Sequence, residues 1–220
     1  MEITYLGHSS FKIKGKAASL VTDPYDPNMV GLKFPKVEAD IVTISHDHGD
    51  HNMESLVFPP QDGKKKVISG PGEYEVKGVS INGFGSFHDD KKGELRGKNT
   101  IYVIYIDEFR LCHLGDLGEG ISEETLSQMG DIDILFVPVG GVFTIGPEKA
   151  GEVVHSIEPK VIIPMHYQQE GINPQVFSEL STVDVFISKT GLRTERFDRY
   201  FIKSPTDLPV EELIAVFTKR

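Results

Sequence analysis

The spacing of hydrophobic and polar positions differs between the two halves of the chain. In the first half, short apolar or alternating runs are separated by glycine, proline and charged residues, which predicts strands joined by hairpins. The predicted strands are residues 3–6, 11–14, 19–22, 41–44, 67–69, 74–76, 79–81, 101–106 and 109–114. The near-continuous β-formers of 101–106 indicate a buried central strand. The prolines and glycine of residues 24–40 predict a loop that borders a pocket or only connects two strands.

From residue 122 onward, helical and extended patterns alternate. Ser122, followed by acidic residues, suits a helix N-terminus, and Pro147 suits the first turn of another helix. We expect helices at 122–129, 147–157 and 174–180, and strands at 132–137, 161–163 and 183–187. The segment 208–217 fits either type. Because no linker separates the halves, the pattern predicts one α+β domain over residues 1–220, with two mixed β-sheets packed face to face and helices outside.

Composition and charge narrow the class of protein. The 220 residues are 39% hydrophobic and carry a net charge of −10, which argues against a broad nucleic-acid surface and against an anionic membrane face. A single cysteine, Cys112, excludes an intrachain disulfide and is expected to be a small buried residue. No signal peptide is recognisable, and no apolar run approaches the ~18 residues of a membrane span. We therefore expect a cytoplasmic protein; a homo-oligomer is compatible with the sequence.

The stretch Ser45–His51 carries the clearest chemical signal. It contains the motif His-x-His-x-Asp-His, so three of the eight histidines fall within six residues. The motif follows the apolar run 41–44 and precedes 52–56, where a helix is expected to start. Imidazole and carboxylate donors suit zinc, manganese or iron, whereas a cysteine-type structural zinc site is excluded by the lack of thiolates.

Other candidate ligands share the context of this motif. An apolar run ends, a glycine or proline breaks it, and the ligand follows; this holds for His88, Asp116 and His166. If the strands are neighbours, these ends meet at one rim. The seven candidate ligands exceed what one tetrahedral ion needs, whereas two metals about 3.5–4 Å apart would use them all. The candidates are His46, His48, Asp50, His51, His88, Asp116 and His166.

Four further residues are open to more than one interpretation. His8 and Asp23 each end a predicted strand, where they either approach the site or serve as turn residues. His113 is expected to lie within its strand rather than to bind metal. His155 is expected on the surface of a helix.

These features together resemble the metallo-β-lactamase-fold hydrolase superfamily, and within it the small UlaG-like and UPF0173-like metal-dependent hydrolases. The resemblance is carried, in the order of the family, by 7–11, 22–24, 46–51, His88, 115–116, 140–148 and 164–167. It implies an αββα sandwich with the metals in a cleft at the sheet rims and a bridging hydroxide as nucleophile. It also implies that His46, His48 and His88 hold a first metal, that Asp50, His51 and His166 hold a second, and that Asp116 bridges them.

The leading functional hypothesis is a metal-dependent hydrolase of an ester, lactone or phosphoester in a small molecule. Two divalent ions are expected, zinc first, with manganese or iron also compatible. Asp50 is the candidate to orient the nucleophile and accept its proton, and Asp23 is a candidate to hold a ligand histidine. His8 and Tyr167 are candidates for substrate contact from position alone.

Alternative functions stay open on the sequence. One is a nuclease or phosphodiesterase of the same fold, and another is a non-catalytic metal-binding regulatory protein. A redox function ranks lower, because His48 stands where redox relatives usually carry glutamate.

Overall fold

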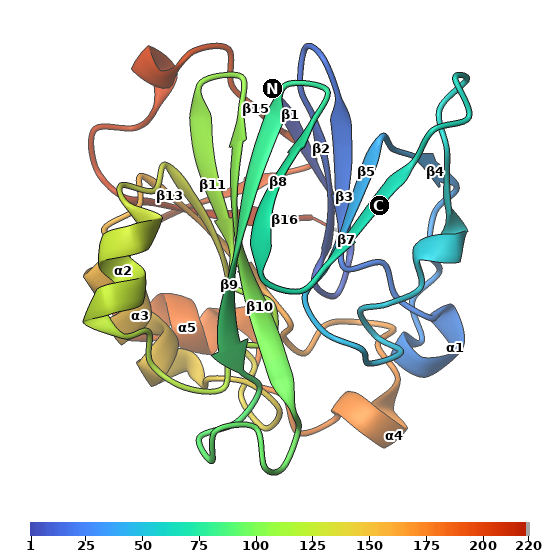
Figure 1. Cartoon of the computed structure of the whole chain (residues 1–220). Helices are drawn as coiled ribbons and strands as arrows, with labels where there is room; N and C mark the ends of the chain where they lie inside the picture. The colour runs from blue at the N-terminus through green and yellow to red at the C-terminus, as the bar shows by residue number, and fades with distance from the viewer. Residues whose placement is uncertain (219–220) are drawn as a thin grey trace.

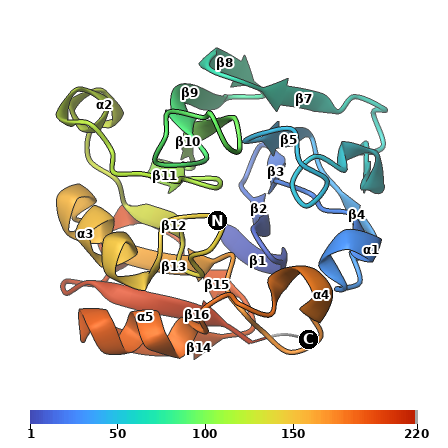
Figure 2. The ribbon, with the colours of Figure 1, turned by 90° about the horizontal axis from the view of Figure 1, so that it is seen from below.

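Two β-sheets lie face to face, with helices on their outer sides (Figures 1 and 2). The structure is a computed structural model and describes residues 1–218. The larger sheet has the order β14-β16-β13-β12-β11-β10-β9-β8, and the smaller has the order β15-β1-β2-β3-β5-β7. The strands of the larger sheet are β8 (Gly72–Val76), β9 (Val79–Phe87), β10 (Lys98–Ile106), β11 (Phe109–His113), β12 (Ile134–Pro138), β13 (Val161–Met165), β14 (Arg193–Phe197) and β16 (Leu213–Phe217). Those of the smaller sheet are β1 (Glu2–Gly7), β2 (Ser10–Lys14), β3 (Ser19–Thr22), β5 (Ile41–Ile44), β7 (Lys66–Ser69) and β15 (Tyr200–Phe201).

Both sheets are mixed, as the sequence predicts. In the smaller sheet, β1, β2 and β3 form an antiparallel meander, and β3, β5 and β7 are parallel. In the larger sheet, β8 to β11 are antiparallel, whereas β11, β12, β13, β16 and β14 are parallel. Two short strands, β4 (Val37–Glu38) and β6 (Val57–Phe58), pair separately.

The helices divide between the two outer faces. The larger sheet is covered by α2 (Glu123–Met129), α3 (Pro147–Ile157) and α5 (Val183–Thr190) (Figure 2). The one-turn helices α1 (Pro27–Val30) and α4 (Pro174–Phe177) lie over the smaller sheet, together with the segment between β3 and β5. Short 3-10 turns occur at Glu54–Leu56 and Pro205–Asp207. No helix within residues 1–218 combines the length and the apolar character that a bilayer crossing requires.

The central strands β12, β13 and β16 of the larger sheet are continuously apolar because both of their faces are buried. In β13, Ile163 points into the cluster between the two sheets, and its neighbour Ile162 points into the cluster beneath the helices. A strand that alternates between two apolar layers reads as an unbroken hydrophobic run. The same reason explains the run 101–106, which lies in β10 between β9 and β11, as expected for a central strand.

The prediction of a strand at 183–187 is wrong, because these residues form α5. Val183 and Phe186 are buried beneath the larger sheet, and Val185 between them is exposed. That spacing of buried positions belongs to a helix, and the β-branched residues that suggested a strand are tolerated because the helix packs against α3. Gly191, in the left-handed conformation with φ of 64°, ends the helix.

Other segments differ from the prediction in smaller ways. The loop 24–40 contains α1, which Asp26 caps, and also contains β4. The helix expected to start in 52–56 is only the 3-10 turn Glu54–Leu56, and the helix expected at 174–180 shortens to α4. The open segment 208–217 contains strand β16, which pairs with β13 and β14.

Candidate metal centre

Six strand ends bring the predicted site residues to one edge of the sandwich. His8 follows β1, Asp23 follows β3 and the 46–51 motif follows β5, and these three strands run in the same direction. In the facing sheet, His88, Asp116 and His166 come after β9, β11 and β13, which also share one direction. The edge lies at the lower end in Figure 1 and faces the viewer in Figure 2. Because these ends meet, the rim predicted from the strand pattern exists.

The Asp116 carboxylate lies at the centre of the gathered residues. Its Oδ2 is 3.2 Å from Nε2 of His88, 3.2 Å from Nε2 of His166 and 3.9 Å from Nε2 of His46. Its Oδ1 is 3.2 Å from Nε2 of His51. One buried carboxylate therefore faces four histidines that come from three segments, the 46–51 motif and the ends of β9 and β13.

The donor atoms fall into three overlapping groups, each with all atoms within 4.8 Å of one another. The first group is His46, His48 and His88, the second is His8, Asp50, His51 and His166, and the third is His46, His51 and Asp116. The first two groups divide the residues as the resemblance implies, and the third connects them through Asp116. The second group also contains His8, which the resemblance does not include among the ligands. Its Nε2 is 3.3 Å from Oδ2 of Asp50.

The buried nitrogens of this cluster fit metal ions better than they fit each other. Within residues 1–218, Nε2 of His46, His51 and His166 has no hydrogen-bond partner, although an Asp116 oxygen lies within 3.9 Å of each. Leaving a buried polar atom without a partner is costly, so such groups are normally paired with protein, water or an ion. Imidazole nitrogens and carboxylate oxygens converging on one point match the donor set of zinc, manganese or iron.

Electrostatics keep the carboxylates of the site ionised. Burial would raise the pKa of Asp116, but His166 and His51 hold it well below its usual range. Burial acts in the same way on Asp50, and His51 and His8 lower its pKa. In the opposite sense, burial would lower the pKa of His51, and Asp116 and Asp50 raise it well above the ordinary value. The site therefore attracts positive charge.

His46 and His48 of the motif favour their neutral form. Burial, with His51 nearby, lowers the pKa of His46 to about 3. Burial, with His88 nearby, lowers the pKa of the more exposed His48. A neutral imidazole is the form that binds a metal ion, so these two residues are prepared for that role at neutral pH.

Asp23 and Ser45 contact the Nδ1 atoms of His51 and His46 in the motif. Asp23 Oδ2 is 2.9 Å from Nδ1 of His51 and accepts a 2.5 Å hydrogen bond from Ser45 Oγ. Ser45 Oγ is in turn 2.9 Å from Nδ1 of His46. The predicted contact of Asp23 with a candidate ligand histidine is therefore present. Ser45 was not predicted, although its position directly before the motif is a signal that could have identified it.

Asn99 holds the loop of Asp116 and was also missed. Its side chain donates to the carbonyl of Leu114 at 2.9 Å and accepts from the backbone N–H of Asp116 at 3.0 Å. Gly115 between them has φ of 56°, and a Cβ at this position would lie 2.3 Å from Asn99 Oδ1. No local signal in the sequence identifies Asn99, because its partners come from a different strand.

The backbone at the site adopts the left-handed conformation at several non-glycine residues. His8 has φ of 55° and His166 has φ of 52°, and the His166 N–H donates to the His8 carbonyl at 3.2 Å. Such conformations are unfavourable for most side chains and occur preferentially at functional sites. Here they turn both imidazoles from their strands toward the shared edge.

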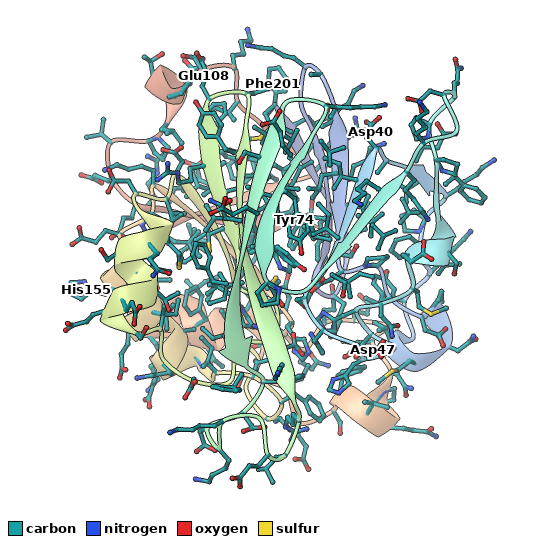
Figure 3. The ribbon with its side chains drawn as sticks, in the orientation of Figure 1. Asp40, Asp47, Tyr74, Glu108, His155 and Phe201 are labelled. Atoms are coloured by element: carbon teal, nitrogen blue, oxygen red, sulfur yellow. The ribbon has the colours of Figure 1, made fainter. Side chains whose placement is uncertain are left out.

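Several candidates lie outside the site. His113 is in β11, where Nε2 is 3.0 Å from the Ser9 carbonyl oxygen, so it joins the two sheets as expected for a strand residue. His155 is exposed on α3 (Figure 3). Cys112 is fully buried, which raises the pKa of its thiol. Tyr167 packs in the cluster beneath the outer helices, so its predicted contact with substrate does not fit its position.

Comparison with known proteins agrees with this geometry. A family model described as the beta-lactamase superfamily domain matches residues 2–166. The chain belongs to this superfamily. The match covers every strand end that carries a candidate ligand, and the sandwich of two mixed sheets is the metallo-β-lactamase fold.

Individual members of the superfamily are similar over most of the chain. A Thermococcus onnurineus protein named UPF0173 metal-dependent hydrolase is 30% identical over 87% of this chain and 97% of its own length. A Thermotoga maritima crystal structure, described as a candidate Zn-dependent hydrolase of the metallo-β-lactamase superfamily, is 36% identical with a TM-score of 0.79, over 98% of this chain and 97% of that one. The Igni18 metallo hydrolase of Ignicoccus hospitalis, 21% identical with a TM-score of 0.64 over 86% of this chain and 90% of that one, shares the fold.

Proposed function

We propose that this chain is a dinuclear metal-dependent hydrolase that cleaves an ester, lactone or phosphoester bond in a small molecule. The observation that carries the proposal is the position of Asp116, whose two oxygens face the Nε2 atoms of four histidines at 3.2 to 3.9 Å. The names of the Thermococcus and Thermotoga relatives support metal dependence and hydrolysis. The net charge of −10 supports a small molecule over nucleic acid as substrate.

The metals would be held by residues from both sheets. His46, His48 and His88 would hold one ion, and Asp50, His51 and His166 would hold the other, with Asp116 between them. Zinc is our first choice, and the donors also accept manganese or iron. Divalent ions held there would lower the pKa of bound water toward neutrality and polarise a carbonyl or phosphoryl oxygen.

The residues of the chain have separate tasks in this reaction. Asp50 is ionised, so its carboxylate can orient an attacking water and accept its proton. His8 is neutral at pH 7, because burial and His166 lower its pKa to about 4, and its Nε2 lies 3.3 Å from Asp50 Oδ2. We assign His8 the role of positioning Asp50.

The test measures metal content and bond specificity in the same preparation. Protein purified without a chelating tag is stripped, reloaded with zinc, manganese or iron, and examined by elemental analysis. It is then assayed with a neutral ester, a lactone and a phosphodiester. We expect about two ions per chain and hydrolysis of at least one class. Fewer than one ion per chain contradicts the dinuclear site, and full loading without hydrolysis of any class contradicts the enzymatic role.

A further inference from the structure

A cation and an aromatic ring meet beside the candidate metal centre. The guanidinium carbon of Arg96 lies 4.9 Å from the centre of the Phe143 ring, and Arg96 Nη2 donates to the Val142 carbonyl at 3.3 Å. Phe143 is in turn 6.3 Å, between ring centres, from His166. The Arg96 guanidinium and the imidazole of the candidate ligand His166 are therefore both neighbours of the Phe143 ring.

The loop that carries Arg96 is held directly at the site. Asp89 follows His88, and its carboxylate accepts four backbone hydrogen bonds of 2.7 to 3.0 Å from the loop. The shortest of them comes from the N–H of Arg96 itself. Because the side chain of Asp89 is buried while its neighbour His88 faces Asp116, the position of Arg96 is coupled to the metal centre.

The loop that carries Phe143 has a strained backbone. Val142 has φ of 62°, a conformation that β-branched residues rarely adopt, and its side chain is 49% exposed. The Val142 carbonyl accepts the hydrogen bond from Arg96, while the Phe143 ring centre lies 5.9 Å from that of the buried Phe177 ring. Backbone strain of this kind persists only where surrounding contacts stabilise it, and such residues are concentrated at functional sites.

The Arg96 side chain has more N–H donors than hydrogen bonds within the described residues. A guanidinium has five N–H donors, whereas the side chain of Arg96 makes one hydrogen bond and no ion pair with a carboxylate within residues 1–218. The planar fork of an arginine matches carboxylate and phosphate oxygens, and stacking on a ring fixes its orientation. In a chain of net charge −10, an unpaired cation at this place is not explained by general surface charge.

We propose that Arg96, stacked on Phe143, binds a negatively charged group of the substrate beside the bond that is cleaved. The substrate would therefore be an anionic ester or lactone, or a phosphoester with a second acidic group, whose anion is a carboxylate or a phosphate. This inference rests on the proposed function, because it places the substrate at the metal centre. Arg96 determines specificity and takes no part in the chemical step.

The test compares binding of charged and neutral probes to the metal-loaded protein. Benzoate, phenylphosphonate and benzamide are titrated calorimetrically into the wild type, Arg96→Met, Arg96→Lys and Lys98→Met. The methionine keeps an unbranched chain over Phe143 and removes the charge together with the N–H donors, and Lys98→Met removes an exposed positive charge from the start of β10. Ordinary binding of an anion to the ions themselves is common to all four proteins.

The expected result is a preference for an anion that depends on Arg96. The wild type and Lys98→Met should bind benzoate or phenylphosphonate at least about 10-fold more tightly than benzamide, from charge-assisted hydrogen bonding. Arg96→Met should lose most of this ratio, and Arg96→Lys should keep part of it. The tighter of the two anions identifies carboxylate or phosphate. An unchanged ratio in Arg96→Met, or no anion preference in the wild type, overturns the proposal. Failure of hydrolysis with the preference intact would instead count against the proposed function.

Discussion

Nδ1 of His51 lies 2.9 Å from Oδ2 of Asp23, and both side chains are fully buried. The contact leaves Nε2 of His51 facing Asp116. A carboxylate on the far nitrogen of a metal-binding histidine fixes its tautomer and orientation and makes the ring a better ligand. Asp23 therefore acts on the candidate metal centre through another residue, and it is a positioning residue.

Replacing Asp23 should weaken metal binding without touching a metal ligand. In Asp23→Asn, the amide nitrogen cannot accept the hydrogen bonds that His51 and Ser45 direct at Oδ2, so His51 is less firmly held. We expect zinc affinity to fall by about 10–100-fold, measured by competition with a chromophoric chelator. Asp40→Asn is the matched control, because Asp40 accepts hydrogen bonds from Ser19 and Lys77 away from the site. Equal zinc affinity in the two variants would show that the Asp23 contact does not serve the metal.

Removing the central carboxylate should disable the site. We expect Asp116→Ala to lower metal occupancy to one ion or less per chain and to abolish hydrolysis, since the two proposed ions would share this residue. The control is Asp47→Ala, within the motif, which is exposed and bonded to Asn52 (Figure 3). Elemental analysis and turnover are measured on both. Unchanged occupancy and rate in Asp116→Ala would remove its bridging role.

His113 should matter for stability and not for metal content. Its two ring nitrogens contact the Ser9 carbonyl and the Gly115 N–H, and His113→Leu leaves both buried groups without these partners. We expect the free energy of unfolding to fall by about 1–3 kcal/mol for each unsatisfied group, measured by urea titration. The exposed His155→Leu provides the comparison. Loss of an ion in His113→Leu at full folding would make it a ligand after all.

The metal-free protein should lose stability as the pH falls below neutrality. Burial and His166 lower the pKa of His8 from 6.5 to about 4, so the unfolded chain protonates this residue first. The unfolded state then binds more protons, and the free energy of unfolding falls as the pH drops from about 6.5 to about 4. Between pH 6 and pH 5, His8 should account for about 1 kcal/mol. The pKa of His51 is raised in the folded state, so His51 favours folding as the pH falls. Because His51 is already mostly protonated in the unfolded chain below about pH 6, this opposing contribution is smaller than that of His8.

The measurement is urea unfolding of chelator-treated protein at both pH values. The decrease should be smaller in His8→Gln than in the wild type, and His155→Gln, on the surface of α3, should behave as the wild type does. A decrease of the same size in all three proteins would mean that His8 is not the group that titrates.

The candidate ligands could be found in the sequence because each comes directly after a run of β-formers. A buried strand broken near its end by a proline and followed by a histidine is a local pattern, and His166 after β13 shows it. The strand prediction at 183–187 was wrong because a local pattern does not contain the packing that decides between strand and helix. Val183 and Phe186 are apolar and β-forming in either structure, and only packing against α3 decides for the helix.

Residues that support the site were harder to predict than the candidate ligands themselves. Asn99 and Arg96 precede or begin β10 and have no motif of their own. Their roles come from contacts with Leu114 and Phe143, which reach the same place through different strands and loops. Tyr167 was a candidate only from its position beside His166 in the chain, and its packing in the cluster beneath the outer helices is likewise decided by the tertiary structure.

The sequence by itself determined the donor chemistry, the two-sheet class of the fold and the strand ends on which the donors lie. These follow from local patterns, since side-chain type and hydrophobic periodicity are properties of short segments. Only the tertiary structure decided that Asp116 faces histidines from both sheets, that His8 reaches Asp50 and that Arg96 stacks on Phe143. Those distances depend on strand order and on the packing of one sheet against the other, which no single segment encodes.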